Sequence, residues 1–433
     1  LQTALDSILG NPSLGYRLID KNIVIYKINS SISDFSGESG DKSSSLRIKG
    51  IIMDKEDKDP LPFATILIQG SRKGTVSNLK GEFSLFIPSQ ETTFLEIAMM
   101  GYKNAYIPIY SNQAEGISIE MERDVVSLQE VIIRYQNPVD ILHKTIENIP
   151  ENYLNEHASI TAYFREYVQR NADFITYSEA VLGIDKSPYN QPFTLDETRL
   201  IKGRKLENIP VEDSLLLKIQ SGVSSSLQLD IVKNSPLFLS RDFEEHYDLQ
   251  FRNMIHYRDR QVYVISFEPV ARSEDAFYQG DLYISSDDLS LVAAEFSITP
   301  EELRKEPERF LVKKSRSIKA RTLKASYRTE YRQTEGKYHI SLVSGEVIFK
   351  LRRKKQWLSS RYRIGIEMAV TDIQPGIRER ISRKDRLKPS AILAEQEFSY
   401  DPSFWGEYNI IEPEASLKDA MKKMGIEWKD FED

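Results

Sequence analysis

The sequence predicts a mainly β protein of the α+β class: a small β-sandwich, then a large meandering antiparallel, half-barrel-like sheet with a few covering helices. Short apolar runs alternate with turn residues from Leu46 to Tyr135, and longer hairpin-like runs recur from Ile160 to Asp372. The chain contains 22 Tyr and 19 Phe, which are enriched in strands. Its 433 residues are too many for one compact core, so we expect two or three domains.

The chain before residue 46 divides into a short structured piece and a linker. Residues 1–9 have an apolar helical face that ends at Gly10, and the following residues to position 28 predict a hairpin turning at Asp20-Lys-Asn. This 1–28 piece is too small to bury a core alone. Residues 29–45 are rich in Ser and Gly and predict a flexible, protease-sensitive linker.

Residues 46–135 predict the small β-sandwich. Evenly spaced short strands with turn signals between them are typical of this architecture. The segment Phe63–Gln69 is apolar on both alternating phases, which indicates a strand buried on both faces. Other strands are expected around Ile48–Ile52, Glu82–Ile87, Phe94–Met99 and Ile117–Met121.

Residues 136–415 predict the large antiparallel domain, and residues 416–433 a C-terminal helix and tail. Asp140–Ile149 predicts a helix, and residues 206–245 predict irregular helical turns that cover the sheet. The segment 374–397 is charged and predicts a surface loop, and Leu417–Met424 predicts the terminal helix. Strands are expected at 160–168, 174–184, 200–205, 247–257, 261–269, 278–284, 291–298, 325–333, 339–351 and 361–372.

Turn glycines and short motifs recur in a fixed order through the sandwich segment: Gly50, Pro62-Phe-Ala, Gly74-Thr, Asn78 followed by Gly81-Glu-Phe, and Met100-Gly-Tyr-Lys. On these residues the segment resembles the carboxypeptidase regulatory-like domain, a transthyretin-like module common in outer-membrane proteins of the Bacteroidetes group. The resemblance implies a module that is not itself catalytic. A zinc carboxypeptidase needs His-x-x-Glu, and none of His143, His157, His246, His256 and His339 has Glu three residues later.

Three weaker resemblances concern the other segments. Residues 1–28 resemble the second half of the short secretin and TonB N-terminal domain; the alternative is an N-terminal appendage that packs on the next domain. Gly280-Asp-Leu-Tyr-Ile-Ser and Val292-Ala-Ala-Glu-Phe resemble the curved half-barrel of the LolA and LolB lipoprotein carriers. Most of residues 46–417 resembles Bacteroidetes regulatory-domain proteins to which no activity is assigned.

Composition excludes several classes of function. The net charge of −7 argues against non-specific nucleic-acid binding. The absence of cysteine excludes disulfides, thiolate metal sites and a cysteine nucleophile. No apolar run is long enough for a transmembrane helix. The start at Leu1 without Met suggests a processed or trimmed chain, from which a lipid-anchor cysteine could have been lost. We expect no cofactor.

Two groups of residues are candidates for contact with a partner or lipid. Basic clusters at Lys202-Gly-Arg204-Lys205 and at Arg352-Arg353 could bind lipid phosphates, although charged hairpin tips that maintain solubility are the more common use. The aromatic residues Phe404, Trp405 and Tyr408 could form a docking surface or plug an open end of the sheet.

Two acidic groups are candidates for chemical sites. Arg165-Glu166 and Glu179 could face each other across the first hairpin and perform acid–base chemistry, but in such positions structural ion pairs between strands are more common than catalytic groups. Asp287-Asp288 could bind Ca²⁺, but two acidic residues supply few ligands and a turn is more common.

The sequence therefore favours a non-enzymatic cell-envelope binding or assembly protein in the periplasm or on the outer membrane. Its β cavity would hold a lipid, another hydrophobic ligand or a partner protein. The partner would be an outer-membrane protein or lipid, and no nucleic acid is expected. Two alternatives remain: a scaffold subunit of an outer-membrane complex, and a hydrolase with an unrecognised carboxylate pair.

Overall fold

The computed structural model describes most of the chain between residues 45 and 388. The described residues are 14–19, 22–27, 45–89, 92–110, 115–124, 137–171, 173–207, 222–271, 273–308, 310, 318–353, 359–388, 391, 393, 396 and 408–411. The predicted helix at 1–9, residues 29–44 of the predicted linker and the predicted helix at 417–424 lie outside them. The predicted hairpin near the N-terminus is present as antiparallel strands β1 (Leu14–Ile19) and β2 (Asn22–Lys27).

A small two-sheet sandwich follows. One sheet has the order β6-β3-β9 and the other β5-β4-β7-β8. The strands are β3 (Ser45–Asp54), β4 (Thr65–Ile68), β5 (Gly74–Val76), β6 (Glu82–Pro88), β7 (Thr92–Ala98), β8 (Ala105–Tyr110) and β9 (Ile117–Met121). Inward-facing apolar side chains of both sheets, among them Ile52, Ile66 and Phe83, form its core.

The turn before β6 shows why glycine and asparagine are needed there. The Asn78 side-chain oxygen accepts hydrogen bonds from the backbone N–H groups of Lys80 and Glu82, each at 2.9 Å. Gly81 has a φ of +74°, and a Cβ at this position would lie 2.2 Å from the carbonyl oxygen of Ile52. Only glycine fits this turn without displacing the backbone of β3.

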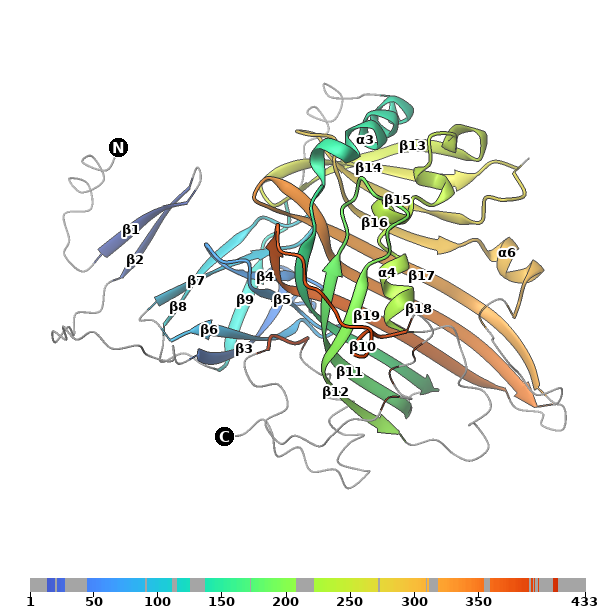
Figure 1. Ribbon diagram of the computed structural model, residues 1–433. Coiled ribbons are helices and arrows are strands. Elements are labelled where there is room, and N and C mark those ends of the chain that lie inside the picture. Colours follow the sequence, from blue (N-terminus) through green and yellow to red (C-terminus); the bar gives the residue numbers. More distant parts are fainter. Residues whose placement is uncertain are drawn as a thin grey trace.

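The second part of the chain forms one ten-stranded antiparallel sheet, which confirms the predicted mainly β fold class (Figure 1). Its order is β12-β11-β10-β19-β18-β17-β16-β15-β14-β13. The strands are β10 (Ala158–Arg170), β11 (Asp173–Lys186), β12 (Glu197–Glu207), β13 (Tyr247–Tyr257), β14 (Arg260–Pro269), β15 (Tyr278–Ser285), β16 (Leu291–Ile298), β17 (Ile318–Thr334), β18 (Lys337–Arg353) and β19 (Ser360–Pro375).

The strand order departs from a pure meander at one place. Strand β10 pairs with β11 on one side and with the last strand, β19, on the other. As a result β12 and β13, which follow each other in sequence, lie at opposite edges of the sheet. Periodicity within each strand predicts a hairpin but carries no information about this long-range pairing.

Short helices cover one face of the large sheet. They are α3 (Pro138–Asn152), α4 (Val223–Gln228), α5 (Ile231–Asn234), η1 (Leu237–Leu239) and η2 (Phe243–Glu245), and α6 (Pro300–Lys305) packs near β17. Asn137 caps α3 by accepting from the Val139 N–H at 3.0 Å. Buried side chains from the helices and the sheet form one core, including Ile141, Val223, Ile231, Phe238, Phe243, Phe164, Ile265, Phe267, Leu282, Val343 and Met368.

The helix-covered face therefore contains a packed core. Phe238 of η1 is fully buried and stacks on Phe267 of β14 with ring centroids 4.4 Å apart.

We predict that Phe238→Ala lowers the free energy of unfolding by about 3–5 kcal/mol because it leaves a cavity. Urea unfolding followed by circular dichroism tests this. Phe193→Ala is the matched control, since Phe193 is 97% exposed; an equal loss in both variants would contradict the assignment.

Candidate functional site

One row of polar side chains crosses all ten strands of the large sheet. Residues in register on neighbouring strands point to the same face, and this row lies on the face opposite the helices. In spatial order it contains Gln250, Ser266, Asp281, Glu295, Arg328, Ser344, Glu367, Arg165, Glu179 and Arg204. The row is buried at its β10–β11 end and opens into a groove at β13–β18.

Arg165 is the centre of the buried half. Its guanidinium contacts Glu367 at 3.1 Å and Glu179 at 3.2 Å, and Arg204 contacts the second oxygen of Glu179 at 2.6 Å. The hydroxyls of Tyr163 and Tyr177 also donate to Glu179. The carboxylate of Glu179 is thus completely buried and held by two arginines and two tyrosines.

The electrostatics of Glu179 follow from these contacts. Burial alone would raise its pKa, but Arg204, Arg165 and the two tyrosine hydroxyls outweigh this and lower the pKa below the ordinary glutamate value. The same cluster raises the pKa of the buried Arg165 despite desolvation. Both groups remain charged at neutral pH. This combination is that of a structural ion-pair cluster.

The predicted carboxylate pair is not brought together. Arg165 lies opposite Glu179 as expected, but Glu166 lies opposite Ser178, the next position along the strand. Because successive side chains in a strand alternate between faces, Glu166 and Glu179 point to opposite sides of the sheet. Among the described residues, no group of three His, Cys, Asp or Glu is placed to hold a metal ion.

Residues 408–411 join the buried half of the row to the sandwich. Arg165 donates to the Ile411 carbonyl at 2.7 Å, and Thr75 of β5 donates to the Ile410 carbonyl at 2.8 Å. The Asn409 side chain accepts from the backbone N–H of Phe86 at 2.8 Å. Ile410 and Ile411 pack in an apolar cluster with Val76, Tyr163, Val181, Leu342 and Ala369. The sandwich is therefore fixed on the sheet through this segment.

The open half of the row forms a groove of about 470 Å³. It is lined by side chains from β13 to β18, mainly charged residues and serines: Arg252, Ser266, Glu268, Asp281, Glu295, Ser297, Lys324, Ser326, Tyr327, Arg328, Ser344 and Glu346. Since every strand from β13 to β18 contributes, the floor of the groove is a rigid hydrogen-bonded sheet.

Opposite charges in the groove are paired across strands. Arg252 lies 3.3 Å from Asp281, Lys324 lies 3.3 Å from Glu346, and Arg328 contacts Glu295. Burial raises the pKa of Asp281 above its ordinary value, with Arg252 opposing this. The groove offers carboxylate oxygens, guanidinium N–H groups and serine hydroxyls at fixed positions, which suits a polar partner.

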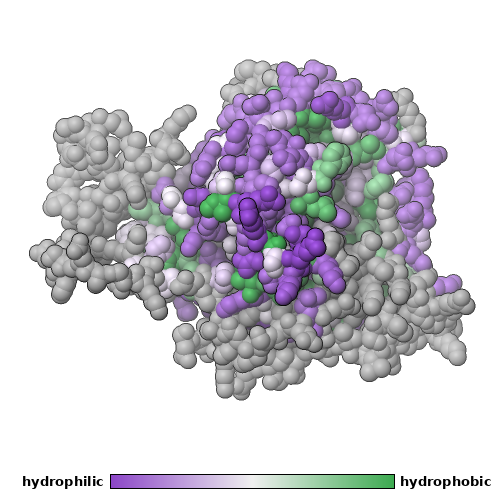
Figure 2. All heavy atoms as spheres, viewed as in Figure 1, coloured by the Kyte–Doolittle hydropathy of each residue, from purple (hydrophilic) through white to green (hydrophobic). Residues whose placement is uncertain are grey.

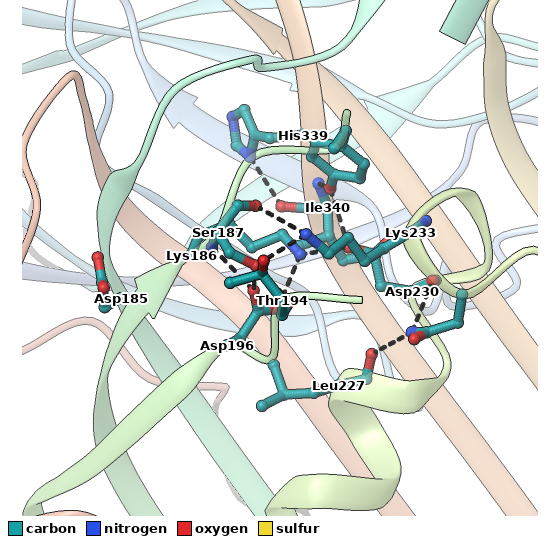
Figure 3. A network of polar contacts seen from close by, with 12 residues as sticks. Asp185, Lys186, Ser187, Thr194, Asp196, Leu227, Asp230, Lys233, His339 and Ile340 are labelled. Atoms are coloured by element: carbon teal, nitrogen blue, oxygen red, sulfur yellow. Dashed lines mark hydrogen bonds and ion pairs between the residues drawn. The ribbon is translucent and has the colours of Figure 1, made fainter. Parts of the chain in front are cut away.

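A second cluster of charges lies under the helices (Figure 3). Lys186 is buried between Asp196 at 2.8 Å and Asp230 at 2.9 Å. Tyr189 and Tyr331 both donate to Asp230, each at 2.9 Å. This cluster fixes the start of α5, whose N-cap is Asp230, against the end of β11 and against β17.

Lys233 of α5 completes this cluster (Figure 3). Its ammonium donates to the Ser187 hydroxyl at 2.8 Å and to the Pro188 carbonyl at 2.5 Å. Burial, followed by the nearby Lys186 charge, lowers the pKa of Lys233 to about 8. A Ser–Lys contact can activate a serine nucleophile, but this ammonium is still protonated at neutral pH and bonded to acceptors. The contact is structural in this geometry.

The residues predicted to contact a partner lie at separate places wherever the structure describes them. Lys202 and Lys205 lie on the edge strand β12, where Lys205 is exposed, while Arg204 is bound to Glu179. Arg352 is exposed at the end of β18, and Arg353 follows it. Tyr408 packs against the apolar cluster of residues 408–411. Phe404 and Trp405 lie outside the described residues. The Asp287-Asp288 pair lies in the turn after β15, where Asp288 contacts Arg260 at 3.4 Å.

The groove residues were missed at the sequence level. Asp281 and Glu295 are each the single charged residue of their strand, β15 and β16, and this is a local signal for a polar row. The strand register aligns these two residues with Arg328. Because the strands are separated by loops of different length, the spacing of the residues in the sequence does not reveal this alignment.

We predict that Glu179→Ala lowers the free energy of unfolding by about 3–5 kcal/mol, because two arginines lose their buried partner. Glu295→Ala removes an ion-paired carboxylate of the same row from the half-exposed groove and should cost about 0–1 kcal/mol. Urea unfolding at neutral pH compares the two variants. A similar loss for both would contradict the division of the row into buried and open halves.

Acidification should lower the stability of the folded protein by protonating the Glu179 carboxylate. Because the pKa of Glu179 is lower in the folded protein, its stabilising contribution is present above the ordinary glutamate pKa and is lost as pH falls through the folded value. Glu179→Gln should therefore show a weaker loss of stability on acidification than the wild type. Parallel pH–stability curves for the two proteins would refute this.

Comparison with known proteins identifies one part of the chain. The search of curated proteins gave no match. Among solved structures, a DUF1329 family protein from Desulfovibrio piger is 13% identical, with 54% of this chain and 94% of that chain covered and a TM-score of 0.21. A structure of lipovitellin is 7% identical, with 53% of this chain and 26% of that chain covered and a TM-score of 0.26. At these TM-scores neither structure informs the fold or function of this chain.

The sandwich has a clear family match. The family model of the CarboxypepD_reg-like domain matches residues 48–133, which include strands β4 to β9 and most of β3. This confirms the resemblance inferred from the glycines and Met100-Gly-Tyr-Lys. The match covers well under half of the chain and concerns the sandwich alone: residues 48–133 are similar to the CarboxypepD_reg-like domain.

Proposed function

We propose that the protein is a non-enzymatic binding or assembly protein of the cell envelope, and that it holds its partner in the open groove on β13–β18. The groove of about 470 Å³ is the observation that carries this proposal. It lies on a broad, rigid sheet, next to the sandwich, and its charged side chains stand in opposed pairs. The CarboxypepD_reg-like domain is compatible with this role.

The geometry favours a polar partner over a hydrophobic ligand inside the sheet. On the helix-covered face, the described side chains pack into one core, with Phe238, Phe243 and Phe267 fully buried. The groove on the opposite face is lined mainly by charged and hydroxyl-bearing residues, with Phe267 and Phe296 also part of its lining. We therefore assign the partner as a protein segment or lipid headgroup that carries both hydrogen-bond donors and acceptors. An outer-membrane protein would satisfy this requirement.

The proposed envelope location is supported by the sandwich and by an amino-acid composition that is compatible with an oxidising compartment. The chain contains no cysteine. None of the helices in the described part of the chain is long and apolar enough to cross a membrane. We propose the periplasm or the outer-membrane surface as the site of action.

A scaffold role is the second candidate, and the fixed sandwich favours it. Residues 408–411 bind β5, β6 and the large sheet at once, so the two domains present a single rigid surface. A scaffold with such a surface would stay bound to its neighbours during purification. A hydrolase based on Glu166 and Glu179 receives no support, since the register places these carboxylates on opposite faces.

A photo-crosslinking amino acid at Ser326, in the groove, tests the proposal in the native envelope. We predict a discrete adduct with an envelope protein or lipid. The matched control is the same amino acid at Asp140, an exposed position of α3 on the helix-covered side. Equal adducts from both positions, or none from Ser326 while the protein stays in its complex, would reject the groove as the contact. Mass spectrometry of the adduct distinguishes a protein partner from a lipid.

A further inference from the structure

Two exposed apolar side chains project from the loop between β11 and β12. Phe193 is 97% exposed and Leu195 is 79% exposed. Exposing a large apolar side chain to water is unfavourable in free energy, because the side chain is not buried against other apolar groups. The loop itself is ordered by local contacts: the Thr194 N–H donates to the Gln191 carbonyl at 3.0 Å, and the Ser187 hydroxyl donates to the Thr194 carbonyl at 2.8 Å.

The segment 377–388 lies beside this loop. The Leu387 N–H donates to the Thr198 carbonyl at 2.8 Å, and Arg386 contacts Glu197 at 2.6 Å. Leu195 and Lys388 line the same pocket, of about 160 Å³. The segment adds a third exposed apolar side chain, Ile377, at 50%. The two segments thus form one surface, which we call the 193/377 patch and define as residues 193–199 and 377–388.

The patch is basic although the chain is acidic. It contains seven Arg or Lys and four Asp or Glu, a net charge of +3, whereas the whole chain carries −7. Three of the four acidic side chains form ion pairs: Glu197 with Arg386, Glu379 with Arg199 at 2.5 Å, and Asp196 with Lys186. The fourth, Asp385, is exposed and accepts a hydrogen bond from the Ser382 hydroxyl at 2.7 Å. The remaining positive charge comes from exposed side chains for which the described part of the chain supplies no ion pair: Arg380, Arg383, Lys384 and Lys388.

The arrangement of these groups matches a lipid surface. The segment after β19 crosses the front of the sheet close to α4 and β12 (Figure 1). In the same view the centre of this face carries strongly hydrophilic spheres with separate hydrophobic ones among them (Figure 2). Apolar side chains that enter the headgroup region, surrounded by Arg and Lys that contact lipid phosphates, are the physical requirements for peripheral membrane binding.

We propose that the 193/377 patch binds an anionic lipid membrane, with Phe193 and Leu195 inserted between headgroups and Arg383 and Lys384 on the lipid phosphates. An acidic protein partner could pair with the basic side chains of the patch, but its binding would not require two exposed apolar side chains in the adjoining loop. The patch shares no residue with the groove, and the inference stands whether or not the groove holds a partner.

Co-sedimentation of the full chain with vesicles tests this inference. The vesicles are phosphatidylcholine alone, or equal parts of phosphatidylcholine and phosphatidylglycerol. We expect binding to the anionic vesicles only, weakened by salt. Phe193→Ser with Leu195→Ser, and Arg383→Glu with Lys384→Glu, should each reduce binding by about tenfold or more, given typical contributions of inserted apolar and basic side chains. All the altered side chains are exposed, so unchanged thermal unfolding is expected.

The matched control is Lys73→Glu with Lys80→Glu, which makes the same change in net charge on exposed positions of the sandwich. This control should bind anionic vesicles much better than the Arg383→Glu, Lys384→Glu variant. Equal losses would show a non-specific charge effect and overturn the proposal, as would a wild type that fails to sediment with anionic vesicles. The assay contains only lipid and this chain, so its failure leaves the groove proposal to be decided by the crosslinking experiment.

Discussion

The pairing of β10 with β19 is the constraint on which the rest of the structure depends. It aligns Ala158–Arg170 with residues 362–375 and so closes a loop of about two hundred residues, at an entropic cost that grows slowly with length. Without it, the hairpins β10–β12 and β13–β19 would be two separate sheets. With it, the sheet gains a central region in which Arg165, Glu179 and Glu367 meet.

That central region also fixes the sandwich. A buried arginine requires acceptors, and Arg165 finds them in Glu179, Glu367 and the backbone of Ile411. Residues 408–411 in turn supply carbonyl and amide groups to β5 and β6 of the CarboxypepD_reg-like domain. One ion-pair cluster thus joins three segments that are far apart in sequence. The sandwich is a fixed part of the surface next to the groove.

The two faces of the sheet have separate physical roles. The helix-covered face buries aromatic and aliphatic side chains and supplies stability, and the Lys186–Asp230 cluster anchors α5 there. The opposite face carries the polar row, which is desolvated under the sandwich and solvated in the groove. The same side-chain types therefore act as a structural cluster at one end and as a binding surface at the other, because burial sets their energetics.

The sequence by itself determined the mainly β class, most of the hairpins and the CarboxypepD_reg-like domain, because these depend on local alternation and on turn residues such as Gly81. It also suggested that Arg165 and Glu179 lie on facing strands of the first hairpin, where ion pairs between strands are common. Only the tertiary structure decided the β10–β19 pairing, the groove of Asp281, Glu295 and Arg328, and the pocket that Leu195 and Lys388 both line. These depend on contacts between segments distant in the chain, and the periodicity of one segment says nothing about which other segment will lie beside it.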